Sequence, residues 1–190
     1  MFLGIDVGTQ SVKAILYDAE LRRVVDVRSA PLQLISAADG TRAQLAQWWI
    51  SAIGLCLAEF DKEDKARIVA LGVSGQQHGF VPLAADGEVL APVKLWSDTS
   101  TVQECEQITE LFGGQARCIS EVGNAILPGY TAAKIRWLKN NLPDAYSRLA
   151  TVLLPHDYIN FYLTGECAME CGDASGTGML DIRRRAWHSG

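Results

Sequence analysis

A short polar turn near the start of the chain carries the residue types that hold a phosphate group and its metal ion. The turn joins two apolar runs and reads Asp6-Val7-Gly8-Thr9-Gln10-Ser11. A glycine lets the backbone approach an anion closely, and successive main-chain N–H groups in a turn can form an anion-binding concavity. Asp6 at a strand end can orient the water shell of Mg²⁺, which prefers oxygen ligands. The candidate phosphate contacts are Gly8, Thr9, Gln10, Ser11 and Lys13.

The same turn has a plain structural alternative. Asp, Gly, Thr and Ser are common in tight hairpin turns because they tolerate or stabilise the turn backbone. The residues match neither the phosphate loop of nucleotide hydrolases nor the dinucleotide-binding fingerprint, since both glycine spacings are missing. From the turn alone, a phosphate site and an ordinary hairpin stay equally open.

A second polar constellation follows an apolar run at residues 68–74. It reads Gly75-Gln76-Gln77-His78-Gly79 and places two amides and an imidazole between glycines. Amides and a neutral imidazole both donate and accept hydrogen bonds, which suits a ligand with many hydroxyl groups. We therefore interpret Gln77 and His78 as candidate substrate contacts. The alternative is a polar loop in which His78 bonds only to a backbone group.

Two further polar loops follow short apolar runs. Trp96 could pack on the C–H face of a sugar ring, and Asp98 could accept hydrogen bonds from hydroxyls. Asp98 could equally cap a helix that begins near Thr99, which is the favoured alternative for that residue. The loop at residues 173–177 reads as a turn into a strand at 179–182.

The elements that must position these loops begin with three predicted strands, at residues 2–6, 11–18 and 22–28. A capping box at residues 41–44 predicts a helix that starts there. Its apolar stripe consists of Leu45, Trp48, Trp49, Ala52, Ile53, Cys56 and Phe60.

The almost wholly apolar run at 68–74 predicts a buried strand, parallel to its neighbour. A three-strand meander, a crossover helix and a parallel fourth strand make a ribonuclease H-like α/β fold, as in actin-like ATPases. Ligands of such sheets lie at the strand ends, where both polar loops are found.

The pattern after residue 80 predicts an inserted lobe over about residues 80–150 within one domain. The elements expected after residue 80 are a hairpin at 81–90, a strand at 93–96, helices at 99–112, 130–141 and 156–164, and a strand at 151–154.

Composition narrows the functional classes. The 190 residues are 48% hydrophobic and 21% charged, with a net charge of −5, as in a globular protein. No basic stripe indicates a nucleic acid partner, and no apolar run is long enough to span a bilayer. The chain shows no secretory signal, and its five scattered cysteines predict reduced thiols in a cytoplasmic protein.

Four segments together resemble the FGGY family of carbohydrate kinases, and most closely its xylulose kinases. The first is the turn from Gly4 to Lys13, and the second is the run from Gly129 to Asn141, which fits the family signature. The third covers Leu153–Tyr158 with Leu163–Glu166, and the fourth is residues 173–177. The resemblance covers essentially the whole chain, and the order and spacing of the segments carry it.

The resemblance implies phosphorylation of a ketopentose, with D-xylulose the first expectation, at the expense of ATP with Mg²⁺. It implies sugar contacts for Gln77 and His78 and a role for Asp6 at the magnesium–phosphate centre. It also implies that the catalytic base, an aspartate, and the adenosine site lie in a second domain beyond residue 190. The alternatives are another sugar or polyol of the family and a non-catalytic sugar-binding module.

Residues 1–190 are therefore expected to be a sugar-binding N-terminal domain with little activity alone. A homodimer is left open. Two departures from the xylulose kinase pattern leave the ketose open. Xylulose kinases often carry a Trp-x-Glu stretch and an Asp-Pro before the first helix, and here residues 37–41 read Ala-Ala-Asp-Gly-Thr instead. Gln77 stands where related enzymes can carry methionine.

Overall fold

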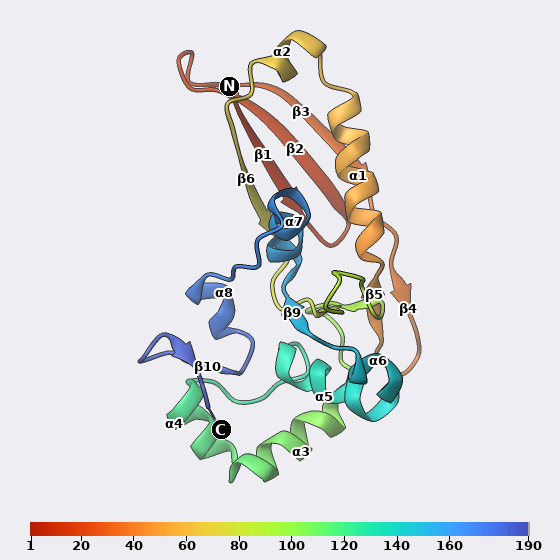
Figure 1. Cartoon of the computed structure of the whole chain (residues 1–190), viewed down its shortest axis with the longest axis vertical. Helices are drawn as coiled ribbons and strands as arrows, with labels where there is room; N and C mark the ends of the chain where they lie inside the picture. Colours follow the sequence, from red (N-terminus) through yellow and green to blue (C-terminus); the bar gives the residue numbers. More distant parts are fainter. Residues whose placement is uncertain (190) are drawn as a thin grey trace.

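A four-stranded mixed sheet forms one end of the molecule (Figure 1). The computed structural model describes residues 1–189. The strand order is β3-β2-β1-β6; the first three strands are antiparallel, and β6 runs parallel to β1. The strand bounds are β1 Phe2–Val7, β2 Ser11–Asp18, β3 Arg23–Pro31 and β6 Ala70–Gly75. This is the predicted ribonuclease H-like arrangement, with the strand ends moved by one to three residues.

Helix α1 (Ala46–Ala58) covers one face of this sheet (Figure 1). Buried and exposed residues alternate along β1, because successive side chains of a strand point to opposite faces. The core between sheet and helix consists of Leu3, Ile5, Val7, Val12, Ala14 and Leu16 against Trp49, Ala52, Ile53 and Cys56. Most of the predicted stripe is confirmed; Trp48 is only partly buried, and Leu45 is exposed.

The predicted capping box at residues 41–44 is wrong. Arg42–Gln44 forms the strand β5, which pairs with β4 (Ile35–Ser36) and β8 (Val93–Lys94). Helix α1 begins after Leu45, which makes no side-chain cap bond. The Gln44 side chain is enclosed among other polar groups, so it cannot reach back to cap the helix.

The prediction that the fourth strand is buried is also wrong. Strand β6 pairs only with β1 in the described chain, and helix α7 (Pro155–Thr164) packs against it. An edge strand with one neighbour keeps much of its surface in solvent, so Leu71 is 47% exposed. The parallel direction, which sets the position of the following loop, is confirmed.

The remaining elements extend away from the sheet (Figure 1). Strand β7 (Val81–Leu83) returns toward Val89 as a hairpin, as predicted, and also pairs with β9 (Thr151–Leu153). The predicted helix at 99–112 starts later, and two glycines with positive φ separate it from the next helix. The other bounds are α2 Lys62–Ala66, α3 Val102–Phe112, α4 Gln115–Val122, α5 Thr131–Asn141, α6 Pro143–Ser147, α8 Cys171–Ser175, β10 Leu180–Asp181 and β11 Ala186–Trp187.

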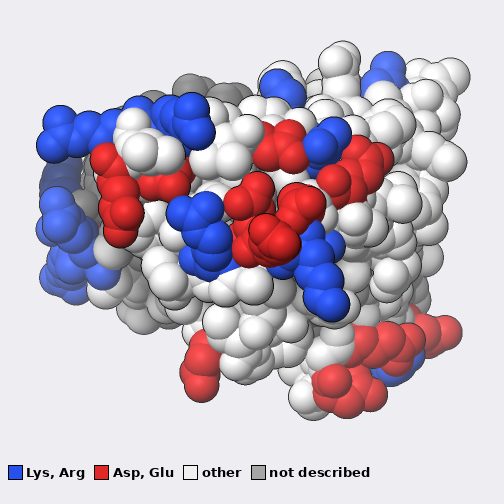
Figure 2. All heavy atoms as spheres, turned by 90° about the horizontal axis from the view of Figure 1, so that it is seen from above, with Lys and Arg blue, Asp and Glu red and all other residues white. Residues whose placement is uncertain are grey.

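The α2 end of the molecule carries charges of both signs. Figure 2 views this end and shows basic and acidic side chains next to one another. Arg67 pairs here with Asp18 at 3.3 Å and with Asp64 at 3.6 Å. Over residues 1–189, no helix is long and apolar enough to cross a bilayer.

We predict that Gly79→Ala destabilises the protein whereas Gly72→Ala does not. A Cβ atom on Gly79 would lie 2.5 Å from Cγ of Pro155 at the start of α7, and one on Gly72 would meet nothing within 4 Å. Overpacking of this kind costs about 1–3 kcal/mol of unfolding free energy. Urea unfolding of both variants checks this, and equal midpoints would contradict the close packing of α7 on the loop after β6.

Candidate functional site

The turn after β1 and the loop after β6 lie side by side. The two strands are parallel and in register, with Asp6 opposite Ser74 and Val7 opposite Gly75. The backbone N–H of Gln76 continues the ladder by donating to the Val7 carbonyl at 2.9 Å. Parallel strands end at the same edge of a sheet, so the two predicted loops meet there. A shared cleft between them stays a prediction.

A network of amide and hydroxyl groups joins the two loops. The Thr9 hydroxyl donates to Oε1 of Gln76 at 3.1 Å, and Nε2 of Gln76 donates to Oε1 of Gln44 at 3.0 Å. Gln44 in turn donates to the Thr9 carbonyl at 2.8 Å and accepts from the Trp49 indole at 2.9 Å. Gln44 is fully buried and Gln76 nearly so. Buried networks with satisfied partners rigidify their surroundings, so the Thr9 turn has a fixed position against the second loop.

The turn itself keeps several groups available for a ligand. Within residues 1–189, the Asp6 carboxylate has no hydrogen-bond or ion-pair partner, and neither do the backbone N–H groups of Thr9 and Gln10. The turn closes through the N–H of Gly8, which donates to the Ser11 carbonyl at 3.1 Å. An exposed carboxylate beside free N–H groups fits a hydrated magnesium ion and a phosphate. No group of three or more metal-ligating side chains forms in the described part of the chain.

His78 adopts a backbone conformation that non-glycine residues rarely take. Its φ is +56°, in the left-handed region. The ring lies 5.0 Å from the Tyr130 ring, and a Cβ atom on Gly176 would lie 1.9 Å from its Cε1. The imidazole therefore occupies a narrow space between an aromatic ring and a bare backbone. Strained conformations of this kind cluster at functional sites.

The His78 imidazole is neutral at physiological pH. Burial lowers its pKa, and the nearby Asp173 opposes that shift only in part. Nδ1 is enclosed and has no partner among the described residues. Nε2 is not enclosed and also has no protein partner, and the adjacent Gln77 side chain is exposed. One imidazole nitrogen and one amide are thus free to bind a hydroxylated ligand.

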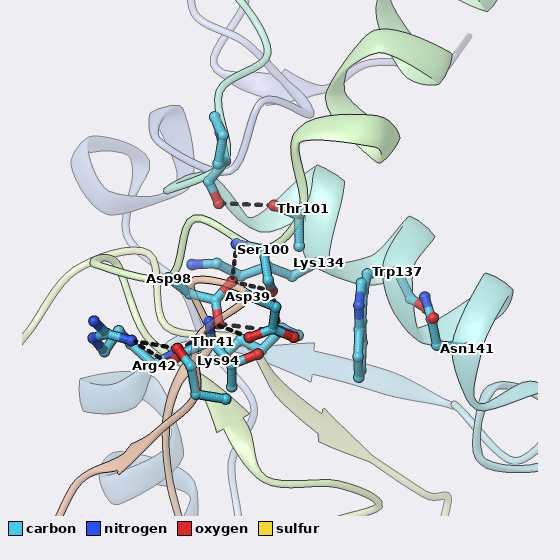
Figure 3. Close-up of polar contacts among 12 residues, drawn as sticks. Asp39, Thr41, Arg42, Lys94, Asp98, Ser100, Thr101, Lys134, Trp137 and Asn141 are labelled. Carbon is cyan, nitrogen blue, oxygen red and sulfur yellow. Dashed lines mark hydrogen bonds and ion pairs between the residues drawn. The ribbon is translucent and has the colours of Figure 1, made fainter.

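Asp98 is occupied by the protein itself (Figure 3). Its side chain is fully buried, and its carboxylate accepts from Nζ of Lys94 at 3.1 Å and from the N–H of Arg42 at 2.9 Å. The hydroxyl and the N–H of Ser100 donate to the other oxygen. The sugar contact of Asp98 stays a prediction, and the helix-cap alternative is wrong, because the N-cap of α3 is Thr101 and no side chain caps this helix. The residue closes the turn before α3, whose N-cap is Thr101.

Trp96 lies at the predicted edge of the site. The residue is 52% exposed, and its indole N–H donates to the Thr9 hydroxyl at 3.0 Å. A Cβ on Gly129 would lie 2.8 Å from the Trp96 carbonyl, so the loop before α5 closes tightly on this residue. The arrangement leaves about half of Trp96 exposed beside the turn that contains Thr9.

A histidine clamped by two carboxylates joins α7 to α8 next to the His78 loop. Nε2 of His156 lies 3.0 Å from Oδ1 of Asp157, and Nδ1 lies 3.0 Å from Oδ2 of Asp173. Contact with the carboxylates of Asp157 and Asp173 raises the pKa of His156 to about 10, against the opposing effect of burial. His156 is therefore protonated at neutral pH and stabilises the junction of the two helices.

Sequence reasoning missed several residues that build this site. Gln44 was assigned to a helix cap and Gln76 received no individual role, although both hold the turn in place. Gly176 lies in the loop interpreted as a turn into a strand, and His156 lies in a segment that carries the family resemblance. The glycines were the sequence signal that could have revealed these contacts, because Gly129 and Gly176 both mark places where two segments of the chain approach closely.

The sheet and its strand-end loops define a ribonuclease H-like α/β fold, and comparison with known proteins gives the family. The FGGY family of carbohydrate kinases, N-terminal domain, matches residues 1–190. The xylulose kinase of Haemophilus influenzae is 39% identical over 98% of this chain, and that of Escherichia coli K12 is 37% identical over 98%. The chain spans 39% and 38% of the length of these two relatives.

Solved structures give the same result. The xylulose kinase of Rhodospirillum rubrum superposes with a TM-score of 0.90 at 28% identity, covering 98% of this chain and 39% of that one. A glycerol kinase from Plasmodium falciparum reaches a TM-score of 0.88 at 21% identity, covering 99% of this chain and 39% of that one. The latter shows the shared fold alone. The chain belongs to the FGGY family of carbohydrate kinases.

The His156 clamp predicts a specific dependence of stability on pH. The folded pKa of about 10 exceeds the ordinary value of 6.5, so the folded state binds the extra proton. The stabilisation is complete below about pH 6.5 and is lost as the pH rises through about 10, with a slope of at most about 1.4 kcal/mol per pH unit. We expect His156→Gln to remove this slope. Urea unfolding between pH 6 and 10 checks it, and parallel profiles for the two proteins would contradict the clamp.

Proposed function

We propose that this chain is the sugar-binding, N-terminal domain of a longer kinase that transfers the γ-phosphoryl group of ATP to a ketopentose. D-xylulose is the proposed substrate and D-xylulose 5-phosphate the product. The observation that carries the proposal is the adjacency of the Thr9 turn and the His78 loop, joined by the bond between Thr9 and Gln76. A phosphate-type turn and a hydroxyl-type loop at one sheet edge suit a reaction between those two groups.

The proposed roles follow from the groups that the protein leaves free. His78 and Gln77 orient the ketose hydroxyls, and Trp96 offers an exposed ring beside them. The N–H groups of Thr9 and Gln10 donate hydrogen bonds to phosphate oxygens, with Gly8, Ser11 and Lys13 lining the same turn. Asp6 orients water molecules around magnesium. When bound, ATP with Mg²⁺ supplies the phosphoryl group and neutralises its charge.

Residues outside this chain complete the proposed reaction. Phosphoryl transfer to a hydroxyl needs a carboxylate that accepts its proton, and we assign that role to an aspartate of the remaining chain. The adenosine site is assigned to a second domain of the same polypeptide. Support comes from the relatives, since this chain spans only 37–39% of the length of three xylulose kinases it matches.

The direct test is a coupled ATP-turnover assay of the full-length protein with a panel of ketoses and polyols. We expect the highest kcat/KM for D-xylulose and little or no turnover by residues 1–190 alone. Preference for glycerol or a hexulose would redirect the substrate within the family. Sugar binding by calorimetry without any turnover would identify a non-catalytic module instead.

Two substitutions in the full-length protein separate the proposed roles. Asp6→Asn is expected to lower kcat by about 10² or more, because it removes the charge that orients the metal, while KM for the sugar changes little. His78→Ala is expected to raise KM for the sugar roughly tenfold through one lost hydrogen bond.

Matched controls are available for both substitutions. Asp86→Asn alters an exposed turn carboxylate, and Arg22→Ala truncates another residue with positive φ, far along the sheet. Both controls should retain wild-type kinetics. An unchanged KM for every pentulose in His78→Ala would contradict the sugar role of the histidine.

A further inference from the structure

A buried lysine holds the backbone of the His78 loop. Lys134 projects from α5 and has no exposed surface. Its ammonium donates to the His78 carbonyl at 2.6 Å and to the Gly129 carbonyl at 2.7 Å. One side chain therefore bridges the loop after β6 and the loop before α5.

Placing an ammonium group here is unfavourable for the fold on its own account. Loss of water lowers the pKa of Lys134 to about 7, and the neighbouring Lys94 adds to the shift while Asp98 opposes it. Asp98 lies with Lys94 and Lys134 in the cluster of Figure 3, yet its hydrogen bonds go to Lys94, Ser100 and Arg42. Among residues 1–189, the Lys134 ammonium donates hydrogen bonds only to the carbonyls of His78 and Gly129. The contribution of Lys134 is therefore to fix the geometry of those two loops.

The carbonyl that Lys134 holds belongs to the strained residue. A non-glycine residue in the left-handed region persists only where its surroundings determine the conformation. On the ring side, Tyr130 and the bare backbone of Gly176 enclose the imidazole. On the backbone side, Lys134 fixes the carbonyl. Tyr130 and Gly129 are neighbours in sequence, so the same lysine also positions the ring that His78 contacts.

We propose that Lys134 is a positioning residue that holds the His78 imidazole between Tyr130 and Gly176, with Nε2 available to a sugar hydroxyl. The identity of the ligand of Nε2 as a sugar hydroxyl rests on the proposed function. The placement of the imidazole does not, because it follows from contacts within the chain. Lys134 acts through His78 and touches no reacting atom.

The test uses Lys134→Met in the full-length protein with two controls on the same helix. Lys139→Met makes the same change at an exposed lysine of the last turn. Leu138→Ala destabilises α5 by opening a cavity at a fully buried leucine of the same helix, and it leaves Lys134 in place. The first readout is the NMR signal and titration of the His78 imidazole. The second is the separation of KM for the ketose from kcat.

We expect Lys134→Met to change the His78 imidazole signal and to raise KM for the ketose roughly tenfold, with kcat altered less than about threefold. Both controls should keep the wild-type His78 signal and KM. A wild-type His78 signal in Lys134→Met, or an equal rise in KM in Leu138→Ala, would overturn the proposal.

Two further variants keep the test decisive. If Lys134→Met does not fold, Lys134→Gln retains a hydrogen-bond donor and should give a smaller change in the same direction; no change would overturn the proposal. Gly176→Ala leaves the lysine in place and should displace the imidazole, since the new Cβ would overlap the ring. If the wild-type protein phosphorylates no sugar, the proposed function fails, and the His78 signal still decides the role of Lys134.

Discussion

The parallel pairing of β1 with β6 is the constraint on which the rest of the site depends. Its register places Asp6 opposite Ser74 and brings the ends of both strands to one edge of the sheet. A binding site formed jointly by the two loops requires that adjacency. A hairpin turn alone binds nothing specific, and an amide–histidine loop alone is a surface feature. Side by side, they place the groups proposed to bind a phosphate and sugar hydroxyls at the same edge.

Buried polar groups, more than apolar packing, hold this edge in shape. Gln44 and Gln76 join the turn to the loop, Lys94 and Asp98 close the segment before α3, and His156 clamps α7 to α8. Each group is expensive to bury unless it is bonded, so partial loss of a network destabilises its members strongly. The arrangement fits a site that must keep small polar groups in fixed positions, whereas the α1 face of the sheet is an ordinary apolar core.

Local patterns predicted the elements with strong periodicity and failed where tertiary contacts decide. The alternating strands, the stripe of α1 and the direction of β6 could be inferred, because side-chain period and strand composition are local properties. The capping box at Thr41–Gln44 failed, because pairing with β8 recruits these residues into a strand. The prediction that β6 is buried failed, because an apolar run in the sequence does not reveal which strand lies at the edge of a sheet.

The residues of the candidate site also divide into those that sequence patterns reveal and those that only tertiary contacts reveal. The turn at Asp6 and the loop at His78 could be recognised from residue types, and their adjacency from the predicted topology. The occupation of Asp98 by Lys94 and Ser100 could not, since these bonds depend on the packing of α5 and its Trp137. The cradle around His78 also joins segments far apart in sequence, so no spacing rule links Lys134 or Gly176 to the histidine.

The most direct measurement is a crystal structure of the full-length protein with D-xylulose and a non-hydrolysable ATP analogue. The account predicts sugar hydroxyls within hydrogen-bonding distance of Nε2 of His78 and the amide of Gln77. It also predicts the terminal phosphate against the N–H groups of Thr9 and Gln10. A sugar bound away from the shared edge of β1 and β6, or a phosphate that avoids the Thr9 turn, would contradict it.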